Sequence, residues 1–254
     1  MLKWIFADSV RGTTVPQHIS RKELKKDEIR ETLVHGAEAA LSHQKQFWTI
    51  GGVALFIALS VFGWRFYAER QTSRASAALE EAMKVYDARI RSAGEPEEPG
   101  EITYVNEKNK FEDAAKKLFD VAQRYSSTRP GLTARYFAAL SQLRVGRAEE
   151  AQKNLREVER SGDDDLAALA RFQLAQVLEK AGKTADAEKL YLQLIARPAT
   201  MLPKQIAMLA LADSYRKSKP EEAAKLYQQL KKDYPDSSVS DRAEERLASL
   251  PPKS

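Results

Sequence analysis

The passage "PEEAAKLYQQLKKDYP" (Pro220–Pro235) has three relatives earlier in the chain, and the four passages together decide the fold. The relatives are "TADAEKLYLQLI" (184–195), "AEEAQKNLREVE" (148–159) and "FEDAAKKLFDVAQRY" (111–125). Aligning the alanine that follows the acidic residue gives steps of 37, 36 and 36 residues between Ala114, Ala151, Ala187 and Ala223. A constant period of this length is the signature of a helical solenoid, in which each unit buries its apolar face against its neighbours.

Further helix patterns lie between these passages. They are "GLTARYFAALSQLRVG" (131–146), "DLAALARFQLAQVLEKAG" (165–182) and "LPKQIAMLALADSYRKS" (202–218). Two antiparallel helices approach closely only where both present a small side chain, so we expect the helices of a pair to meet at Ala139, Ala175 and Ala212, eleven or twelve residues before the repeat alanine. Larger residues four and seven positions after the repeat alanine fill the next groove: Leu155, Val158, Tyr191, Leu194, Tyr227 and Leu230. Turns are expected at Gly146, Gly182 and Pro220.

With these small residues at these positions, the chain resembles the tetratricopeptide repeat. The match covers 131–235 and reaches back to an irregular first pair, with helices expected over 71–92 and 104–124. The loop between them, "AGEPEEPGE" (93–101), is a solvated linker or, alternatively, an acidic hook for a partner. A closing helix is expected over 240–250, which gives a tetratricopeptide-like domain of about four helix pairs over 71–250. The predicted fold class is all-α.

The resemblance implies a concave face lined by the first helix of each pair. Aromatic and apolar positions flanked by basic ones suit an extended peptide or an acidic partner segment. Packing inside the solenoid is the other interpretation of the same side chains. The residues that the repeat pattern places on this face are Tyr136, Leu140, Arg144, Phe172, Gln176, Lys180, Leu209, Asp213, Arg216 and Lys217.

A second feature, "FWTIGGVALFIALSVFGW" (47–64), carries no charge although 30% of the chain is charged. Between Gly51 and Gly63 its only polar side chain is Ser60, so it lacks the polar positions of an amphipathic core helix. As a helix it would span roughly 27 Å, which is within the range for crossing a bilayer. A cleaved signal peptide fits poorly because the run starts late and no small-x-small site follows it.

Residues at both ends of this run suit a membrane interface. Trp48, Trp64 and Tyr67 are amphipathic rings that favour the headgroup region, and Arg65 closes the run. We therefore expect one uncleaved transmembrane helix over 47–67 in contact with the lipid bilayer. The basic residues within twenty positions before the run (Arg30, Lys45) and after it (Arg65, Arg70, Arg74, Lys84) favour an outside N-terminus, whereas a cluster further upstream favours the opposite. Charge alone leaves the orientation open.

Two segments precede the membrane helix. Residues 1–19 are expected to be a disordered tail. Residues 20–46 predict a charged juxtamembrane helix that starts with a capping box, Ser20 to Glu23. This helix either lies on the membrane or continues into the span; alternatively, it is a docking helix for another membrane protein.

The composition excludes several kinds of chemistry. The chain has no cysteine, and its three histidines, His18, His35 and His43, all precede the apolar run. After Trp64 the chain therefore has no residue for a cysteine nucleophile, for a catalytic histidine, or for a metal site with cysteine or histidine ligands. We therefore expect a protein that is not an enzyme and that has no metal or cofactor. The alternative, an enzyme subunit with catalytic carboxylates, would require a bound substrate or a strongly raised Asp or Glu pKa in a cleft. The net charge of +5 is spread over helical faces without a basic, aromatic-rich stripe, so nucleic acid is not an expected partner.

The order of tail, anchor and repeats, together with "GWRFY" (63–67) closing the span, resembles the family of ancillary subunits of the bacterial SecYEG translocon. The resemblance implies a cytoplasmic N-terminus, an inner-membrane anchor and a periplasmic repeat domain. It also implies a non-enzymatic scaffold whose partners are translocon subunits, a periplasmic chaperone or emerging polypeptides. The alternative is an envelope-assembly or cell-division scaffold, because "LYQQLKKDYPDSSVSDRAEERL" (226–247) is similar to the repeats of such proteins.

Overall fold

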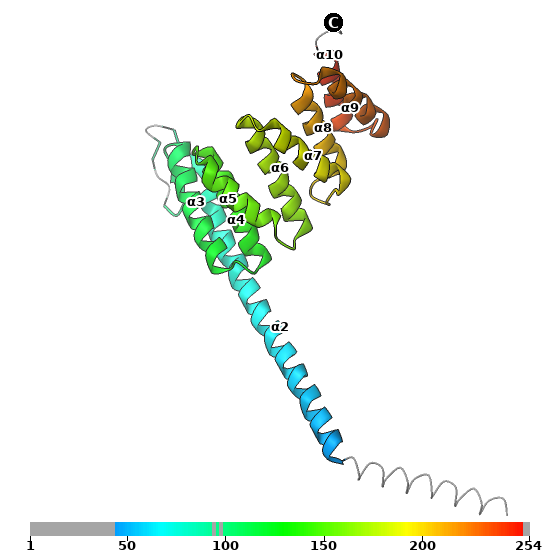
Figure 1. Cartoon of the computed structure of the whole chain (residues 1–254). Helices are drawn as coiled ribbons and strands as arrows, with labels where there is room; N and C mark the ends of the chain where they lie inside the picture. The colour runs from blue at the N-terminus through cyan, green and yellow to red at the C-terminus, as the bar shows by residue number, and fades with distance from the viewer. Residues whose placement is uncertain (1–43, 93–94, 97–98, 251–254) are drawn as a thin grey trace, which may run out of the picture. The chain divides into compact units, whose positions relative to one another are not determined.

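The computed structural model describes residues 44–92, 95–96 and 99–250. Its chain divides into two compact units, residues 1–65 and 66–254. The elements of the described part, shown in Figure 1, are in chain order α2 (Gln44–Tyr86), β1 (Arg89–Ile90), β2 (Thr103–Tyr104), α3 (Glu107–Arg124), α4 (Arg129–Arg144), α5 (Ala148–Glu159), α6 (Asp164–Lys180), α7 (Thr184–Ala196), α8 (Lys204–Tyr215), α9 (Pro220–Asp233) and α10 (Ser238–Ala248). The expected tail (1–19) and most of the juxtamembrane helix (20–46) lie outside the described residues.

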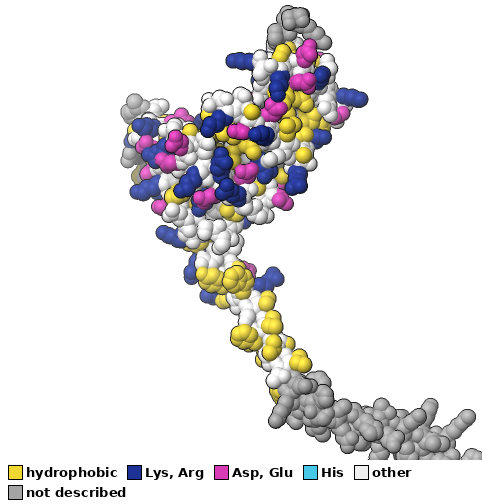
Figure 2. Space-filling view, viewed as in Figure 1, with side chains coloured by type: hydrophobic (Ala, Val, Ile, Leu, Met, Phe, Trp, Pro, Cys, Tyr) yellow, Lys and Arg dark blue, Asp and Glu magenta, His cyan; other side chains and the backbone are white. Residues whose placement is uncertain are grey.

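The first part of α2 is the apolar run. All side chains from Trp48 to Trp64 are exposed, and this part of the helix is long and apolar enough to cross a membrane. Figure 2 shows this apolar surface on the helix. Helix formation satisfies every backbone N–H and C=O internally, which is what hydrocarbon requires of a spanning segment.

Helices α3 to α10 form a solenoid in which each helix packs mainly against the next one along the chain (Figure 1). The small residues lie where the spacing placed them: all seven alanines, four repeat alanines and three partner alanines, are fully buried, which confirms the expected close approaches. The larger residues that follow are fully buried as well, among them Leu155, Tyr191 and Tyr227. The fold is therefore all-α with one long apolar helix and a repeat solenoid, as predicted.

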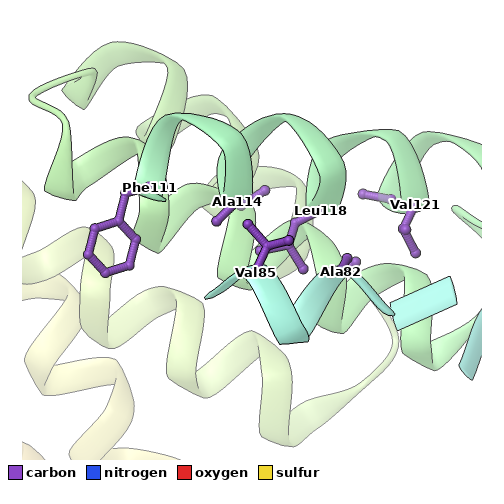
Figure 3. Close-up of a cluster of buried hydrophobic side chains, with 9 residues drawn as sticks. Ala82, Val85, Phe111, Ala114, Leu118 and Val121 are labelled. Atoms are coloured by element: carbon purple, nitrogen blue, oxygen red, sulfur yellow. The ribbon is translucent and has the colours of Figure 1, made fainter. Parts of the chain in front are cut away.

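The last turns of α2 belong to the solenoid. Figure 3 shows Ala82 and Val85 of α2 packed against Phe111, Leu118 and neighbouring side chains of α3. The ring of Tyr86 meets those of Phe111 and Phe137 edge to face, with centroids 5.5 and 5.1 Å apart. This helix and α3 thus form the irregular first pair.

The structure corrects the bounds of that first pair. The first helix ends at Tyr86 rather than at 92, and the chain then forms β1, which pairs in parallel with β2. The second helix begins at Glu107 rather than at 104 because the side chain of Asn106 caps it, accepting a 2.8 Å hydrogen bond from the backbone N–H of Asn109. The two short strands were not predicted.

The later turns follow from local chemistry. Gly146 and Gly182 have φ of 80° and 76°, a left-handed conformation that glycine adopts without strain, and they end the first helix of two pairs. Pro220 opens α9, where its missing N–H costs nothing. The closing helix α10 begins at Ser238, two residues before the expected start, because the hydroxyl of Ser237 caps it.

Candidate peptide-binding surfaces

Two of the residues predicted for a concave peptide groove lie in the core. Tyr136 is 7% exposed and packs in one cluster with Leu155 and Leu174, and burial raises the pKa of its phenol. Leu209 is 4% exposed and packs against Tyr227. For these two side chains the contacts in the structure are packing contacts.

Three further members of the predicted set make side-chain contacts within the solenoid. The guanidinium of Arg144 lies 3.5 Å from the carboxylate of Glu107 and 5.6 Å from the ring of Phe111. Phe172 meets Tyr191 edge to face at 6.0 Å, and Leu140 is half-buried against the α4–α6 core. Leu140 and Phe172 are therefore half-buried, whereas the side chain of Arg144 stays exposed.

The predicted residues near the end of α8 are bound to the last two helices. Asp213 accepts a 2.7 Å hydrogen bond from the hydroxyl of Tyr227, and its carboxylate is 3.6 Å from Arg246 of α10. Arg216 donates to the hydroxyl of Ser249 at 3.1 Å. Lys217 is exposed. The set therefore does not form one continuous surface of free side chains along α4, α6 and α8.

Two of the predicted residues do line a cavity together. Gln176 and Lys180 of α6 border a cavity of about 280 Å³ whose other walls come from α4 and α5, including Leu143 and Gln152. This small cavity is the part of the predicted surface where the structure brings accessible side chains together.

A larger groove lies on a different surface, between α3 and α5. We call it the α3–α5 groove; its volume is about 700 Å³, and its floor is formed by α4 together with Asn154 of α5. The floor is polar: Arg135, Gln142 and Asn154 are 12%, 6% and 4% exposed, counting the side chain alone for Arg135. The walls add two apolar contributions from α3, Ala115 and Phe119.

Hydrogen bonds connect the floor of this groove. Asn154 Nδ2 donates to Gln142 Oε1 at 2.9 Å, and Gln142 Nε2 donates to Glu150 at 3.3 Å. Arg135 donates to Asn154 Oδ1 at 3.3 Å and forms an ion pair with Glu157. Buried amides are stable in a protein only when they are bonded in this way, so the network fixes both amides in place.

The rim of the α3–α5 groove carries both signs of charge. Four basic residues face four acidic ones, so the lining has no net charge. Arg147 lies 4.0 Å from carboxylates of both Glu112 and Glu150, one on each wall. Figure 2 shows basic and acidic side chains interleaved over this part of the solenoid. A surface of this kind does not select a strongly charged ligand.

The described residues show no metal site and no raised carboxyl pKa. In the described part of the chain, no group of three or more His, Asp or Glu residues could hold a metal ion. Where the pKa of a described carboxyl group shifts, it falls: a hydrogen bond from Lys219 lowers the pKa of Glu188, and one from Arg89 lowers that of Glu95. Lowered carboxyl pKa values are typical of ion pairs, whereas a general acid needs a raised one.

The sequence contained a signal for the α3–α5 groove that was missed. Gln142 and Asn154 occupy repeat positions where the next repeat, 36 residues on, has Leu178 and Leu190. Polar residues at two positions that the next repeat fills with leucine mark a local departure from simple packing.

The geometry defines a helical-repeat protein with grooves between its helices, and comparison with known proteins gives its family. The model of the tetratricopeptide repeat-like domain matches residues 44–199, and a second tetratricopeptide repeat model matches 206–237. Since the first match spans more than half of the chain, the protein belongs to the tetratricopeptide repeat-like domain family. Neither family indicates a catalytic activity.

Comparison with individual proteins adds only to the fold. No curated protein matches the chain. A solved structure of a kinesin light chain from Podosopora anserina, described as having nearly identical TPR-like repeats, is similar with a TM-score of 0.51. The identity is 18%, and the similarity covers 70% of this chain and 85% of that chain. At this identity the likeness supports the solenoid fold alone.

Proposed function

We propose that the protein is a membrane-tethered, non-enzymatic scaffold that binds protein partners through its repeat domain. The observation that carries the proposal is one chain holding both a tetratricopeptide-like solenoid and a helix with a long, fully exposed apolar surface. Phe56 and Phe62 are 72% and 71% exposed on that helix, an arrangement that water disfavours and lipid accommodates.

The ends of the apolar run support membrane insertion. Trp48 and Trp64 are exposed near the two ends, at the positions where interfacial rings are enriched. Beyond Arg65, the guanidinium of Arg70 lies 4.3 Å from the centroid of the Phe66 ring, and Gln71 donates to the Tyr67 hydroxyl at 2.8 Å. Aromatic and basic side chains suit the lipid headgroup region, which a span ending near residue 67 would place next to these residues.

The cellular setting is proposed from the order of the parts. The expected order of tail, single span and tetratricopeptide-like domain resembles the arrangement of ancillary SecYEG subunits. We therefore propose the bacterial inner membrane, a cytoplasmic N-terminus and a periplasmic repeat domain. The proposed partners are translocon subunits, a periplasmic chaperone or emerging polypeptides.

An envelope-assembly or cell-division scaffold is the second candidate. The observation that favours it is the passage 226–247, which covers most of α9 and α10 and is similar to the repeats of such proteins. Crosslinking in intact cells separates the two candidates. Recovery of translocon subunits supports the first, and recovery of outer-membrane assembly or division proteins supports the second.

The first experiment determines on which side of the membrane the repeats lie. Spheroplasts carrying the full chain with a C-terminal epitope are treated with an external protease and blotted. Loss of the epitope is expected, because the proposed domain is periplasmic. If the epitope survives until the membrane is lysed, the repeats are cytoplasmic and the translocon–chaperone proposal is wrong.

A second experiment tests the tether. Removing residues 1–67 should leave a helical domain that no longer co-purifies with the translocon, since the bilayer segment holds it there. A matched control replaces 47–67 with an unrelated transmembrane helix. Equal recovery of the translocon by the untethered domain would show that membrane attachment contributes nothing to recognition.

A further inference from the structure

The α3–α5 groove differs from the equivalent groove of the next repeat in its size and in the side chains at two repeat positions. That second groove, between α5 and α7, has a volume of about 310 Å³ and is lined by Leu178 and Leu190. These leucines stand 36 residues after Gln142 and Asn154, and Leu226 follows Leu190 by another 36. The repeat pattern therefore accepts leucine where the larger groove has two buried amides.

If packing were their only role, amide side chains at these positions would lower the stability of the fold relative to leucine. Burying an amide is unfavourable unless it is hydrogen-bonded, and a well-packed apolar pair in the same place is neutral or stabilising. Gln142 and Asn154 are held in one orientation by Arg135 and Glu150. A polar floor kept in a fixed orientation at the base of an open groove is suited to binding a ligand.

The floor retains unused hydrogen-bonding capacity. A side-chain amide offers two N–H donors and two acceptor lone pairs. Among the described residues, Gln142 donates one hydrogen bond and accepts one, and Asn154 does the same. Each amide therefore keeps a donor and an acceptor, which is the pairing that a peptide unit of another chain can satisfy.

The size and charge of the groove match a polypeptide main chain. Arg135 and Gln142 are about two turns apart on α4, roughly 10 Å, which is the length of about three residues of extended chain. The lining has no net charge, so it favours neither an acidic nor a basic ligand. Phe119 and Ala115 on the α3 wall add apolar contact for side chains.

We propose that the α3–α5 groove binds an extended segment of a partner polypeptide through its main chain, with the amides of Gln142 and Asn154 exchanging hydrogen bonds with its peptide units. The proposal rests on the proposed function in one respect, that the ligand is a polypeptide. It assigns binding to a surface formed by α3, α4 and α5 rather than to the concave face of the solenoid. Recognition of the main chain makes the groove tolerant of sequence.

The test uses the full chain in detergent micelles and a peptide of alternating serine and threonine, with blocked termini, that carries an electrically neutral fluorophore. This probe is uncharged and favours extended structure. A second probe has the same side chains, but its backbone nitrogens are methylated and cannot donate. Fluorescence anisotropy should show binding of the first probe and at least about tenfold weaker binding of the second, as expected for losing two or more hydrogen bonds.

The protein variant that matches this probe pair is Gln142→Leu combined with Asn154→Leu. It installs the side chains that the next repeat carries, so the thermal midpoint should be unchanged or higher while affinity falls by at least about tenfold. Gln176→Leu, in the small cavity formed by α4, α5 and α6, is the control and should bind the probe normally. Raising the salt from about 50 mM to about 500 mM should change the affinity less than about twofold, because no net charge is involved.

Three results would overturn the proposal: no binding of the unmethylated probe, equal binding of both probes, or normal binding by the folded double variant. A steep salt dependence would do the same, since it would mean that the charged rim binds the ligand. Failure of this proposal is distinguishable from failure of the proposed function. If the chain co-purifies with the translocon but does not bind the probe, only the groove proposal is wrong. If the chain binds the probe in micelles but the spheroplast experiment places its repeats in the cytoplasm, only the proposed cellular setting is wrong.

Discussion

Gly131 is the residue at which the absence of a side chain matters most. A β-carbon built at this position would lie 1.9 Å from the carbonyl oxygen of Tyr125, which is fixed backbone. Its N–H also donates to the capping hydroxyl of Thr128 at 3.1 Å. Gly131→Ala should therefore displace the start of α4 and lower the free energy of unfolding by about 1–3 kcal/mol, measured by thermal and urea unfolding of the full chain in detergent.

Gly162 is the matched control for this substitution. A β-carbon there would meet no atom within 4 Å, and its φ is not positive. Gly162→Ala should leave the free energy of unfolding unchanged or raise it by about 0.4–1 kcal/mol, because alanine restricts the unfolded chain. Equal effects of the two substitutions would show that the close approach at Gly131 does not determine stability.

The ion pair of Glu188 predicts a stability change with pH. Lys219 lies 2.8 Å from this carboxylate, and that hydrogen bond, with a second from Tyr215, lowers its pKa. A lowered pKa means that the folded state favours the charged form, so the stabilisation is present above the ordinary pKa of 4.5 and is lost as the pH falls below it. Glu188→Gln should cost about 0.5 kcal/mol at pH ~7 and nothing at pH ~2, as measured by urea unfolding. A constant difference across this range would contradict the assignment.

At the scale of elements, α10 closes the apolar end of the solenoid. Val239 and Ala243 are buried against Met208, Tyr227 and Leu230. Deleting residues 236–254 should expose this cluster, lower the thermal midpoint and increase binding of a hydrophobic dye, because a terminal repeat needs a polar outer face. Deleting only 251–254 is the control and should have no such effect. An unchanged midpoint after the longer deletion would mean that α8 and α9 need no cover.

The elements themselves were predictable to different degrees. The buried alanines and the glycine turns fix the helices from α4 to α9, because small residues and left-handed turns leave clear traces in a sequence. The first pair was less predictable: its connection of 20 residues, from Asp87 to Asn106, forms two short strands whose pairing depends on contacts that no local pattern encodes.

The candidate site was less predictable than the fold. The repeat pattern assigns a position to each residue, yet it does not say which position a neighbouring helix covers. Asp213 and Arg216 were expected on an open surface, and they bond to α9 and α10 instead. Gln142 and Asn154 are not distinctive as single residues, because the groove that they line exists only where α3 and α5 flank α4.

At the scale of the whole molecule, the solenoid should unfold in parts. Each helix packs mainly on its sequence neighbours, and in the described part of the chain four clusters of buried apolar side chains lie between Ala82 and Ala243. In such a chain, stability is close to a sum of neighbouring contacts, so damage at one end need not reach the other. Leu230→Ala empties a fully buried position in the last cluster and should cost about 2–5 kcal/mol there.

Hydrogen exchange of the full chain measures how far that damage spreads. Leu230→Ala should speed exchange of backbone amides in α8, α9 and α10 and leave α3, α4 and α5 unchanged. Leu118→Ala, at an equally buried position in the first cluster, is the matched variant and should give the opposite pattern. Faster exchange throughout the solenoid in either variant would show that the repeats unfold as one cooperative unit. Ligand binding at the α3–α5 groove would then be coupled to the stability of the distant end.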